Sequence, residues 1–267
     1  MISFIVQGPV ESATQMTVDS IREFFPDSEI ILATTNKGRK ILNVDKIYDA
    51  GYEEEMNVNK QILSSQAVNE ARFDISCKIR NDIIFTGKDG IMEFIEKKLL
   101  SSTPPKRLPK YKLFSRFVLA SNYHFCNPYK SGFYYCPSDW MALGLTEDLK
   151  TLYNIPLQVK EENEYILPEK IEVANVGMIE PKRMKYRPEQ YIFVKALQQK
   201  GFDISLDYEY QVPDDPESAL KWMINNFQVI DTGKDFFCRK YPFLKGPNGN
   251  LINEDTYRTI HNVFIGG

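Results

Sequence analysis

Four short apolar runs of strand length follow one another in the first third of the chain, and segments with helical periodicity separate them. The runs cover Ile2–Gln7, Glu29–Ala33, the neighbourhood of Ile47 and Tyr48, and Ile75–Ile79. Helical patterns at Thr17–Phe25 and Asn59–Ala71 stand between them. Uninterrupted apolar strands that alternate with amphipathic helices are typical of a sheet covered on both faces. The sequence therefore predicts an α/β fold with a Rossmann-type, mostly parallel central sheet flanked by helices.

The rest of the chain is less regular but contains four further helical patterns. They lie at Gly90–Leu100, Thr146–Tyr153, Glu189–Lys200 and Glu217–Asn226. Three prolines make Ser101–Pro109 an extended loop, and Phe114–Ala120 fits either a strand or a helix. At 267 residues the chain is long enough for one large domain. We expect residues 1–200 to form the main domain, with a smaller, irregular and helical C-terminal extension at 201–267 packed on it.

Several classes of protein are disfavoured by what the sequence lacks. No apolar run approaches the roughly 18 residues that span a bilayer, and no basic region precedes the first apolar run, so we expect a cytoplasmic protein. The four cysteines include no Cys-x-x-Cys pair, which argues against a zinc knuckle or a redox motif. The sequence has only two histidines and no Gly-x-Ser-x-Gly motif, which argues against a serine hydrolase. It also has no P-loop motif, which argues against a P-loop nucleotidase.

One stretch of the chain is strongly basic although the net charge of the whole is -3. No acidic residue occurs from Lys97 to Pro137, where the cations are Lys97, Lys98, Lys106, Arg107, Lys110, Lys112, Arg116 and Lys130. Such a block indicates an anionic partner. For residues 97–135 this would be an anionic glycolipid or the inner membrane face; the alternative is a solvated loop with its Tyr and Phe side chains in the core. The acidic pI of about 5.6 disfavours nucleic acid.

Arg80, Asn81 and Asp82 directly follow the apolar run at Ile75–Ile79. Ligands of an open parallel sheet bind beyond the carboxyl ends of its strands, so Arg80 and Asp82 reach the binding edge. A sugar nucleotide leaves a diphosphate behind, and its growing charge needs Arg, Lys or a divalent cation held by oxygen ligands. Arg80 and Asp82 can supply either element. The alternative is a surface ion pair, or an Asp that forms the turn after the strand.

Ser138-Asp139-Trp140 is a second candidate for chemistry. An acceptor hydroxyl has to lose its proton as it attacks a sugar, and Asp139 could take that proton as a general base. Trp140 could then offer a flat face to the sugar. The alternative is a helix-capping Ser or Asp next to a core Trp.

Several segments, taken in order, point beyond these single motifs. They are Gln7-Gly8-Pro9, Ser20-Ile21-Arg22 with Phe25-Pro26, Glu29-Ile30-Ile31-Leu32, Asn59 and Gln61-Ile62 with Ser64-Ser65, Lys78-Ile79-Arg80-Asn81-Asp82, Ser138-Asp139-Trp140 with Gly144 and Asp148-Leu149, and Pro188-Glu189-Gln190-Tyr191. This ordered set resembles the WavE lipopolysaccharide-synthesis family. The resemblance spans residues 7–191 and depends on order and spacing rather than on any one motif.

The resemblance implies a GT-A-like glycosyltransferase that moves a sugar from a nucleotide-sugar donor to a hydroxyl of lipopolysaccharide core, O-antigen or capsule. It implies catalytic roles for Asp82 and Asp139, and acceptor contacts for Ser138, Trp140 and Glu189. The donor site would comprise Gln7, Gly8, Pro9, Thr34, Asn59, Gln61, Arg80 and Asn81. Asp82 would be the metal ligand for Mg²⁺ or Mn²⁺, although Arg80 replaces the first acid of the Asp-x-Asp motif of GT-A enzymes and leaves metal dependence open.

Two other functions remain compatible with the sequence. A sugar nucleotidyltransferase also pairs an α/β sheet with metal-bound phosphates, but the Gly-rich N-terminal loop with Arg and Lys expected there is missing. A catalytically inactive glycan- or glycolipid-binding accessory protein would keep the fold without the chemistry.

Overall fold

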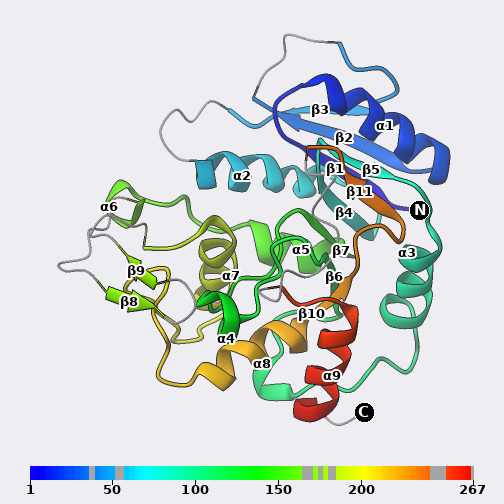
Figure 1. Cartoon of the computed structure of the whole chain (residues 1–267). Coiled ribbons are helices and arrows are strands. Elements are labelled where there is room, and N and C mark those ends of the chain that lie inside the picture. Colours follow the sequence, from blue (N-terminus) through cyan, green and yellow to red (C-terminus); the bar gives the residue numbers. More distant parts are fainter. Residues whose placement is uncertain are drawn as a thin grey trace.

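A seven-stranded sheet, counted over the described residues, runs through the computed structural model, with helices on both of its faces (Figure 1). The structure describes residues 1–35, 40–51, 57–163, 171–173, 177–179, 185–240 and 251–265. The strands of the sheet are β1 (Ser3–Gln7), β2 (Glu29–Thr34), β3 (Lys46–Asp49), β4 (Ile75–Arg80), β6 (Val118–Ser121), β7 (Met141–Leu145) and β10 (Phe227–Ile230). Their order across the sheet is β10-β6-β7-β4-β1-β2-β3.

Only one strand of this described sheet opposes the others. β7 is antiparallel to its neighbours β4 and β6, whereas β1 is parallel to β2 and β4, β2 to β3, and β10 to β6. Two short antiparallel pairs lie outside the sheet, β5 (Ile83–Phe85) with β11 (Phe236–Cys238) and β8 (Ile171–Val173) with β9 (Gly177–Ile179). The prediction of a mostly parallel α/β sheet is confirmed.

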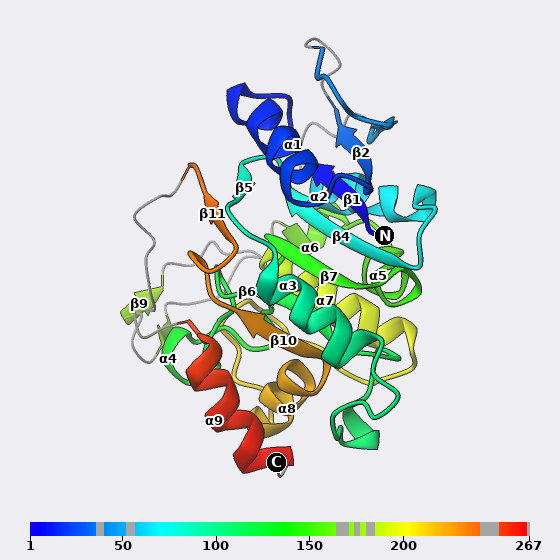
Figure 2. The ribbon, with the colours of Figure 1, turned by 90° about the vertical axis from the view of Figure 1, so that its right-hand side faces the viewer.

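Helices cover the sheet in two layers. They are α1 (Ser12–Phe24), α2 (Asn57–Ser65), α3 (Asp89–Phe94), α4 (Pro128–Ser131), α5 (Thr146–Tyr153), α6 (Lys160–Asn163), α7 (Pro188–Gln199), α8 (Pro216–Asn226) and α9 (Glu254–Ile265), with 3₁₀ turns η1 (Gln66–Glu70) and η3 (Pro109–Tyr111) and a π turn η2 (Ile95–Leu99). Figure 2 shows α1 and α3 on one side of the strands and α5 and α7 on the other.

The two layers have separate hydrophobic cores because side chains alternate along each strand. On β1, Phe4 and Val6 pack with the core beneath α1 and α3, whereas Ile5 packs with the core that α2, α5, α7 and α8 cover. β4 alternates in the same way, with Cys77 and Ile79 in the first core. The opposite face of β4 carries Ser76, Lys78 and Arg80, so this strand delivers polar groups toward one layer only.

Several elements differ in extent from the sequence prediction. α1 begins at Ser12 rather than Thr17, because the backbone N–H of Glu11 donates to the Thr14 hydroxyl in a capping box. The Asn59–Ala71 pattern divides into α2 and η1. Only Val118–Ser121 of the ambiguous Phe114–Ala120 segment forms a strand.

The C-terminal part is not only helical. β10 forms the edge of the central sheet beside β6, and β11 pairs with β5, so residues beyond 201 complete both sheets. The prediction of a helical extension was therefore too simple, and the boundary at residue 200 stays a prediction. Across the described part of the chain, no helix has the length and apolar content needed to cross a membrane.

Candidate active site

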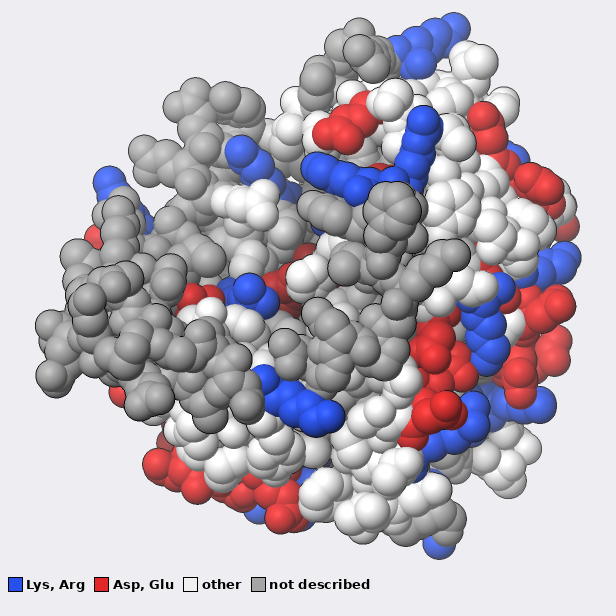
Figure 3. All heavy atoms as spheres, viewed as in Figure 1, with Lys and Arg blue, Asp and Glu red and all other residues white. Residues whose placement is uncertain are grey.

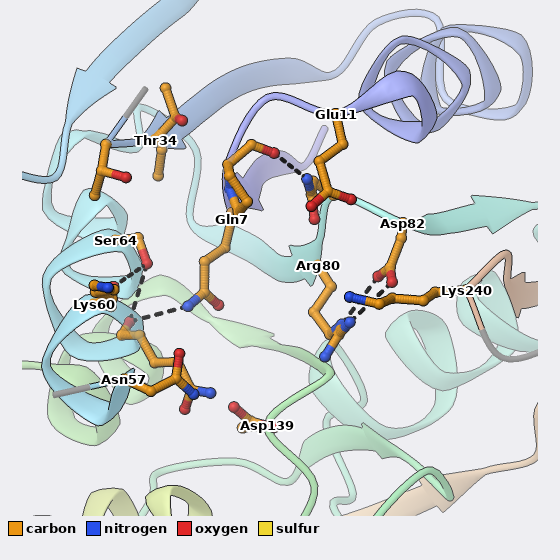
Figure 4. A pocket seen from close by; sticks show the side chains of 16 residues that line it. Gln7, Glu11, Thr34, Asn57, Lys60, Ser64, Arg80, Asp82, Asp139 and Lys240 are labelled. Carbon is orange, nitrogen blue, oxygen red and sulfur yellow. Dashed lines mark hydrogen bonds and ion pairs between the residues drawn. The ribbon is translucent and has the colours of Figure 1, made fainter. Parts of the chain in front are cut away.

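A cleft of about 410 Å³ opens at the carboxyl ends of β1, β2 and β4. It is lined by Gln7, Gly8, Pro9, Glu11, Ala33, Thr34, Thr35, Asn57, Lys60, Gln61, Ser64, Arg80, Asn81, Asp82, Asp139 and Lys240. Figure 4 shows these side chains converging from β1, β4, α2 and the segment before β7. Figure 3 shows both basic and acidic side chains beside a hollow near the middle of the face that is seen in Figure 1. Nine of the predicted site residues therefore meet here: Gln7, Gly8, Pro9, Thr34, Gln61, Arg80, Asn81, Asp82 and Asp139.

The loop after β1 is shaped by a close approach between Gly8 and Asn81. Gly8 has a φ of +135°, a conformation that favours glycine. The Asn81 amide donates to the Pro9 carbonyl and, at 3.2 Å, to the Thr14 hydroxyl, while the Asn81 backbone N–H donates to the Gln7 carbonyl at 2.9 Å. Asn81 therefore ties the end of β4 to the first loop and fixes one wall of the cleft.

Replacing Gly8 with alanine should destabilise the fold by about 2–4 kcal/mol. An added Cβ would lie 2.6 Å from Oδ1 of Asn81, whose side chain is held by two hydrogen bonds and cannot move freely. Gly201→Ala is the matched control, because Gly201 also has a positive φ of +85° but nothing within 4 Å of the added Cβ; it should cost about 1 kcal/mol. Urea denaturation measures both, and equal losses would contradict the proposed clash.

Two amide oxygens at the cleft have no hydrogen-bond donor among the described residues. The Gln7 side chain donates to the Gln61 carbonyl at 3.2 Å, but its Oε1 is buried without a partner. The Oε1 of Gln61 is buried and unpartnered as well. Because unsatisfied buried acceptors are costly, these two oxygens favour a ligand that brings N–H or O–H donors to this wall.

Arg80 and Asp82 form a bidentate ion pair at the end of β4. Nε and Nη2 of Arg80 each donate to one oxygen of Asp82 at 2.9 Å, and the carboxylate is almost fully buried. The guanidinium also lies 4.3 Å from the centre of the Trp140 ring. Burial lowers the pKa of Arg80, but the hydrogen bonds and charge of Asp82 outweigh it and raise the pKa. Within the described ranges Nη1 of Arg80 forms no hydrogen bond, so this fixed cation can offer that group to a ligand.

Two cleft cations were missed by the sequence analysis. Lys60 lies on α2 beside Gln61, and Lys240 comes from the far end of the chain. The pairing of Cys238 with Ile83, and a 2.9 Å hydrogen bond from the Arg239 N–H to the Asp82 carbonyl, carry the chain after β11 to the end of β4. Figure 4 shows the Lys240 side chain reaching toward the Arg80–Asp82 pair. The basic pair after Phe236-Phe237-Cys238 was the available signal.

Asp139 lies at the lower end of the cleft in the view of Figure 4, and its carboxylate forms an ion pair with the buried Lys78. Nζ of Lys78 donates to the backbone carbonyl of Asp139 and lies 4.0 Å from its Oδ2. Lys78 is fully buried, and its ammonium lies 5.9 Å from the centre of the Tyr153 ring. Burial lowers the pKa of Lys78, while the charge of Asp139 opposes that change. The lysine thus fixes the position of Asp139.

Glu189 lies in the first turn of α7 and interacts electrostatically with Asp139. Burial, and then the charge of Asp139, raise the pKa of Glu189 to about 7, against the opposing charges of Arg187 and Lys78. The predicted acceptor contact at Glu189 is not part of the cleft lining. Glu189 is therefore connected with the cleft only by its electrostatic interaction with Asp139.

The raised pKa of Glu189 predicts a pH-dependent stability. The folded chain holds the Glu189 proton up to about pH 7, whereas the unfolded chain releases it near its ordinary value of 4.5. The stabilisation is therefore complete below the unfolded pKa and lost as the pH rises through the folded one. Between about pH 5 and pH 8 the wild type should lose about 2 kcal/mol that Glu189→Gln does not lose. Urea denaturation at both pH values checks this, and parallel curves would refute it.

Three of the residues predicted to contact a ligand, Asn59, Ser138 and Trp140, are not among the described residues that line the cleft. The Asn59 amide is buried and exchanges two hydrogen bonds with the backbone of Gln158, at 3.1 and 2.8 Å, so it anchors α2 instead of facing a donor. Ser138 is buried and bonds to Ser121 at 2.9 Å.

Trp140 has no face to offer a sugar. It is 5% exposed and stacks on Tyr123 with ring centres 4.6 Å apart, while Arg80 covers it at 4.3 Å. The Trp140 ring instead supports the guanidinium of Arg80, which packs against it.

A divalent cation at this site would take few ligands from the protein. Among the described residues, no group of three or more His, Cys, Asp or Glu side chains could hold a metal ion. Asp82 offers one carboxylate, whose oxygens both accept from Arg80. Mg²⁺ is often bound through one or two carboxylates with phosphate oxygens and water as the other ligands, so the residues fit a cation carried by a diphosphate.

A family comparison decides where this chain belongs. The family model described as WavE lipopolysaccharide synthesis matches residues 2–236, most of the chain. The chain belongs to the WavE family. The matched span includes every predicted site residue, and Lys240 lies beyond it. The family description names lipopolysaccharide synthesis, and the observed mostly parallel α/β sheet agrees with the sheet predicted from the sequence.

Two solved structures are similar at low identity. A crystal structure of S. aureus TarS shares 12% identity with this WavE protein over 89% of this chain and 36% of that chain, with a TM-score of 0.35. A crystal structure of S. aureus TarS 1-349 shares 12% identity over 98% of this chain and 72% of that chain, with a TM-score of 0.36. The chain thus spans about a third of the first TarS chain. None of the curated proteins matches this sequence.

Proposed function

We propose that this WavE protein transfers a sugar from a nucleotide-sugar donor to a hydroxyl of a bacterial surface glycan, such as lipopolysaccharide core, O-antigen or capsule. One observation carries the proposal: the Arg80–Asp82 pair lies at the carboxyl end of β4 in a cleft that Lys60 and Lys240 also line. Three cations, Lys60, Arg80 and Lys240, line this cleft together with three carboxylates, those of Glu11, Asp82 and Asp139. The three cations suit the two linked phosphates of a sugar nucleotide. The unpartnered oxygens of Gln7 and Gln61 suit the N–H and O–H groups of the same molecule.

The transfer step assigns a separate role to each end of the cleft. Asp139 accepts the proton of the acceptor hydroxyl while the oxygen of that hydroxyl forms a bond to the anomeric carbon of the donor sugar. The bond from that carbon to the donor phosphate breaks, and its electron pair leaves with the nucleotide. Arg80 and Lys240 stabilise the charge that develops on the leaving phosphate. Lys78 acts as a positioning residue, because it holds Asp139 through the backbone carbonyl.

A divalent cation is a further part of the proposal. Asp82 would hold Mg²⁺ or Mn²⁺ together with the donor phosphates, and the cation would add to the positive charge around them. EDTA should then lower the transfer rate, and Mn²⁺ should restore it. A rate that does not change with EDTA would mean that Arg80 and the lysines alone neutralise the leaving group.

Product analysis with a panel of sugar nucleotides tests the function. Transfer predicts release of a nucleoside diphosphate or monophosphate together with a glycosylated acceptor. Release of pyrophosphate would instead identify a sugar nucleotidyltransferase. Glycan binding without turnover of any donor would identify an accessory protein.

A further inference from the structure

Two adjoining cavities lie apart from the active-site cleft. One, of about 410 Å³, lies between α9 and β10, and the other, of about 280 Å³, lies along the segment after η2. They share Lys98, Pro105 and Phe117, and neither shares a lining residue with the cleft. Figure 2 faces this side of the molecule, with α9 and the segment after α3 in its lower half.

The linings of these cavities carry many cations and little negative charge. The set, called the basic face below, consists of Lys98, Lys106, Arg107, Lys112, Arg116 and Arg258. Among the described residues that line the two cavities, Glu254 is the one acidic residue, and it is already paired with Lys234 at 3.0 Å and with Arg258 at 3.4 Å. In the part of the chain that the structure describes, Lys98, Lys106, Lys112 and Arg116 form no ion pair. The basic face therefore has unbalanced positive charge.

Arg107 adds a cation that the fold holds in place. Its Nε donates to the Asn225 carbonyl at 2.7 Å and its Nη2 to Oδ1 of Asn226 at 2.9 Å. Its Nη1 is buried and has no hydrogen-bond partner within the described ranges. Burial lowers the pKa of Arg107 to about 10, so the guanidinium stays charged at neutral pH. These hydrogen bonds are with neutral groups, and the charge of Asp148 offsets only part of the effect of burial on the pKa of Arg107.

The cations of the basic face are spread over two adjoining cavities and over separate segments of the chain, at Lys98, at residues 106–116 and on α9. Spread positive charge suits the many headgroups of an anionic bilayer, to which each Lys or Arg near the surface adds binding free energy. A single soluble anion would contact only a few of these cations.

We propose that the basic face binds the phosphate headgroups of anionic lipids and docks the protein on a membrane surface. The surface is narrower than the basic segment at 97–135, because most of the aromatic side chains that follow Arg116 are buried in the cores, as the alternative sequence interpretation expected. It is also broader in one respect, since Arg258 of α9 joins it from the other end of the chain. The inference is independent of the transfer reaction.

Vesicle co-sedimentation without any sugar nucleotide tests this proposal. The full chain should bind vesicles of phosphatidylglycerol and should bind phosphatidylcholine vesicles far more weakly. The triple variant Lys98→Ala, Lys106→Ala, Lys112→Ala should lose affinity for phosphatidylglycerol by on the order of 100-fold. The control Lys40→Ala, Lys88→Ala, Lys200→Ala removes the same charge from exposed lysines outside both cavities and should change the affinity by less than about 3-fold.

Each other outcome would overturn the proposal. Equal losses in the two triple variants would mean that net charge alone drives binding. Equal binding to both lipids would mean that the headgroup charge is not recognised. Displacement of the protein from vesicles by inorganic phosphate at constant ionic strength would mean that the basic face is a site for a soluble phosphate. Circular dichroism confirms that each variant is folded.

Discussion

Asp139→Asn is expected to lower kcat by about 100- to 10,000-fold, since the asparagine cannot take the proton of the acceptor hydroxyl. The substitution keeps the size of the side chain and the backbone carbonyl that Lys78 holds. Donor affinity should therefore stay close to that of the wild type. Steady-state kinetics with a saturating donor measure the change in kcat, and calorimetry with the nucleotide measures donor binding.

Two further variants make the Asp139 result specific. Asp203→Asn is the control, because Asp203 is exposed and does not line the cleft, and this variant should leave kcat unchanged. Glu189→Gln alters the carboxyl group that interacts electrostatically with Asp139 and should lower kcat by less than Asp139→Asn does. If Glu189→Gln caused the larger loss of kcat, the proton acceptor would be Glu189 instead of Asp139.

The second large effect is expected at the ion pair of β4. Arg80→Met should lower kcat/KM by about 100- to 1,000-fold, because it removes the fixed cation that stabilises the leaving phosphate. Arg80→Lys should recover only part of the loss, since a lysine can neither bind Asp82 in a bidentate way nor stack as flatly on Trp140. Kinetics at several donor concentrations measure both variants.

The fold needs a separate control in this experiment. Arg80→Met leaves the buried Asp82 carboxylate without its partner, which can cost about 3–5 kcal/mol of stability. The double variant Arg80→Met, Asp82→Asn removes that unpaired charge and should regain most of the stability while remaining inactive. Full activity in this folded double variant would show that the pair has no part in transfer.

Local patterns predicted the elements that place the cleft. The apolar runs that became β1, β2 and β4 are continuous because both faces of those strands are buried, and the polar residues after each run mark the ligand-binding edge. Arg80 and Asp82 could therefore be assigned to that edge from the sequence, whereas Gln7 was placed in the donor site by the resemblance alone. The direction of β7 could not, since Met141–Leu145 is as apolar as a parallel strand would be.

The misjudged residues depend on contacts between distant parts of the chain. Lys240 reaches the cleft only because β11 pairs with β5, more than a hundred residues earlier. Trp140 looked like a sugar platform because an aromatic ring next to Asp139 carries no sign of its burial against Tyr123. The same holds for Asn59, whose partner Gln158 lies beyond any local pattern.

Calorimetric titration with nucleoside diphosphates tests the central claim, that the edge beyond β4 binds two linked phosphates. We predict that at least one nucleoside diphosphate binds the wild type and binds the Arg80→Met, Asp82→Asn variant at least about 10-fold more weakly, while the nucleoside without phosphates binds both alike. Equal affinity of the diphosphate for the two folded proteins would contradict the claim.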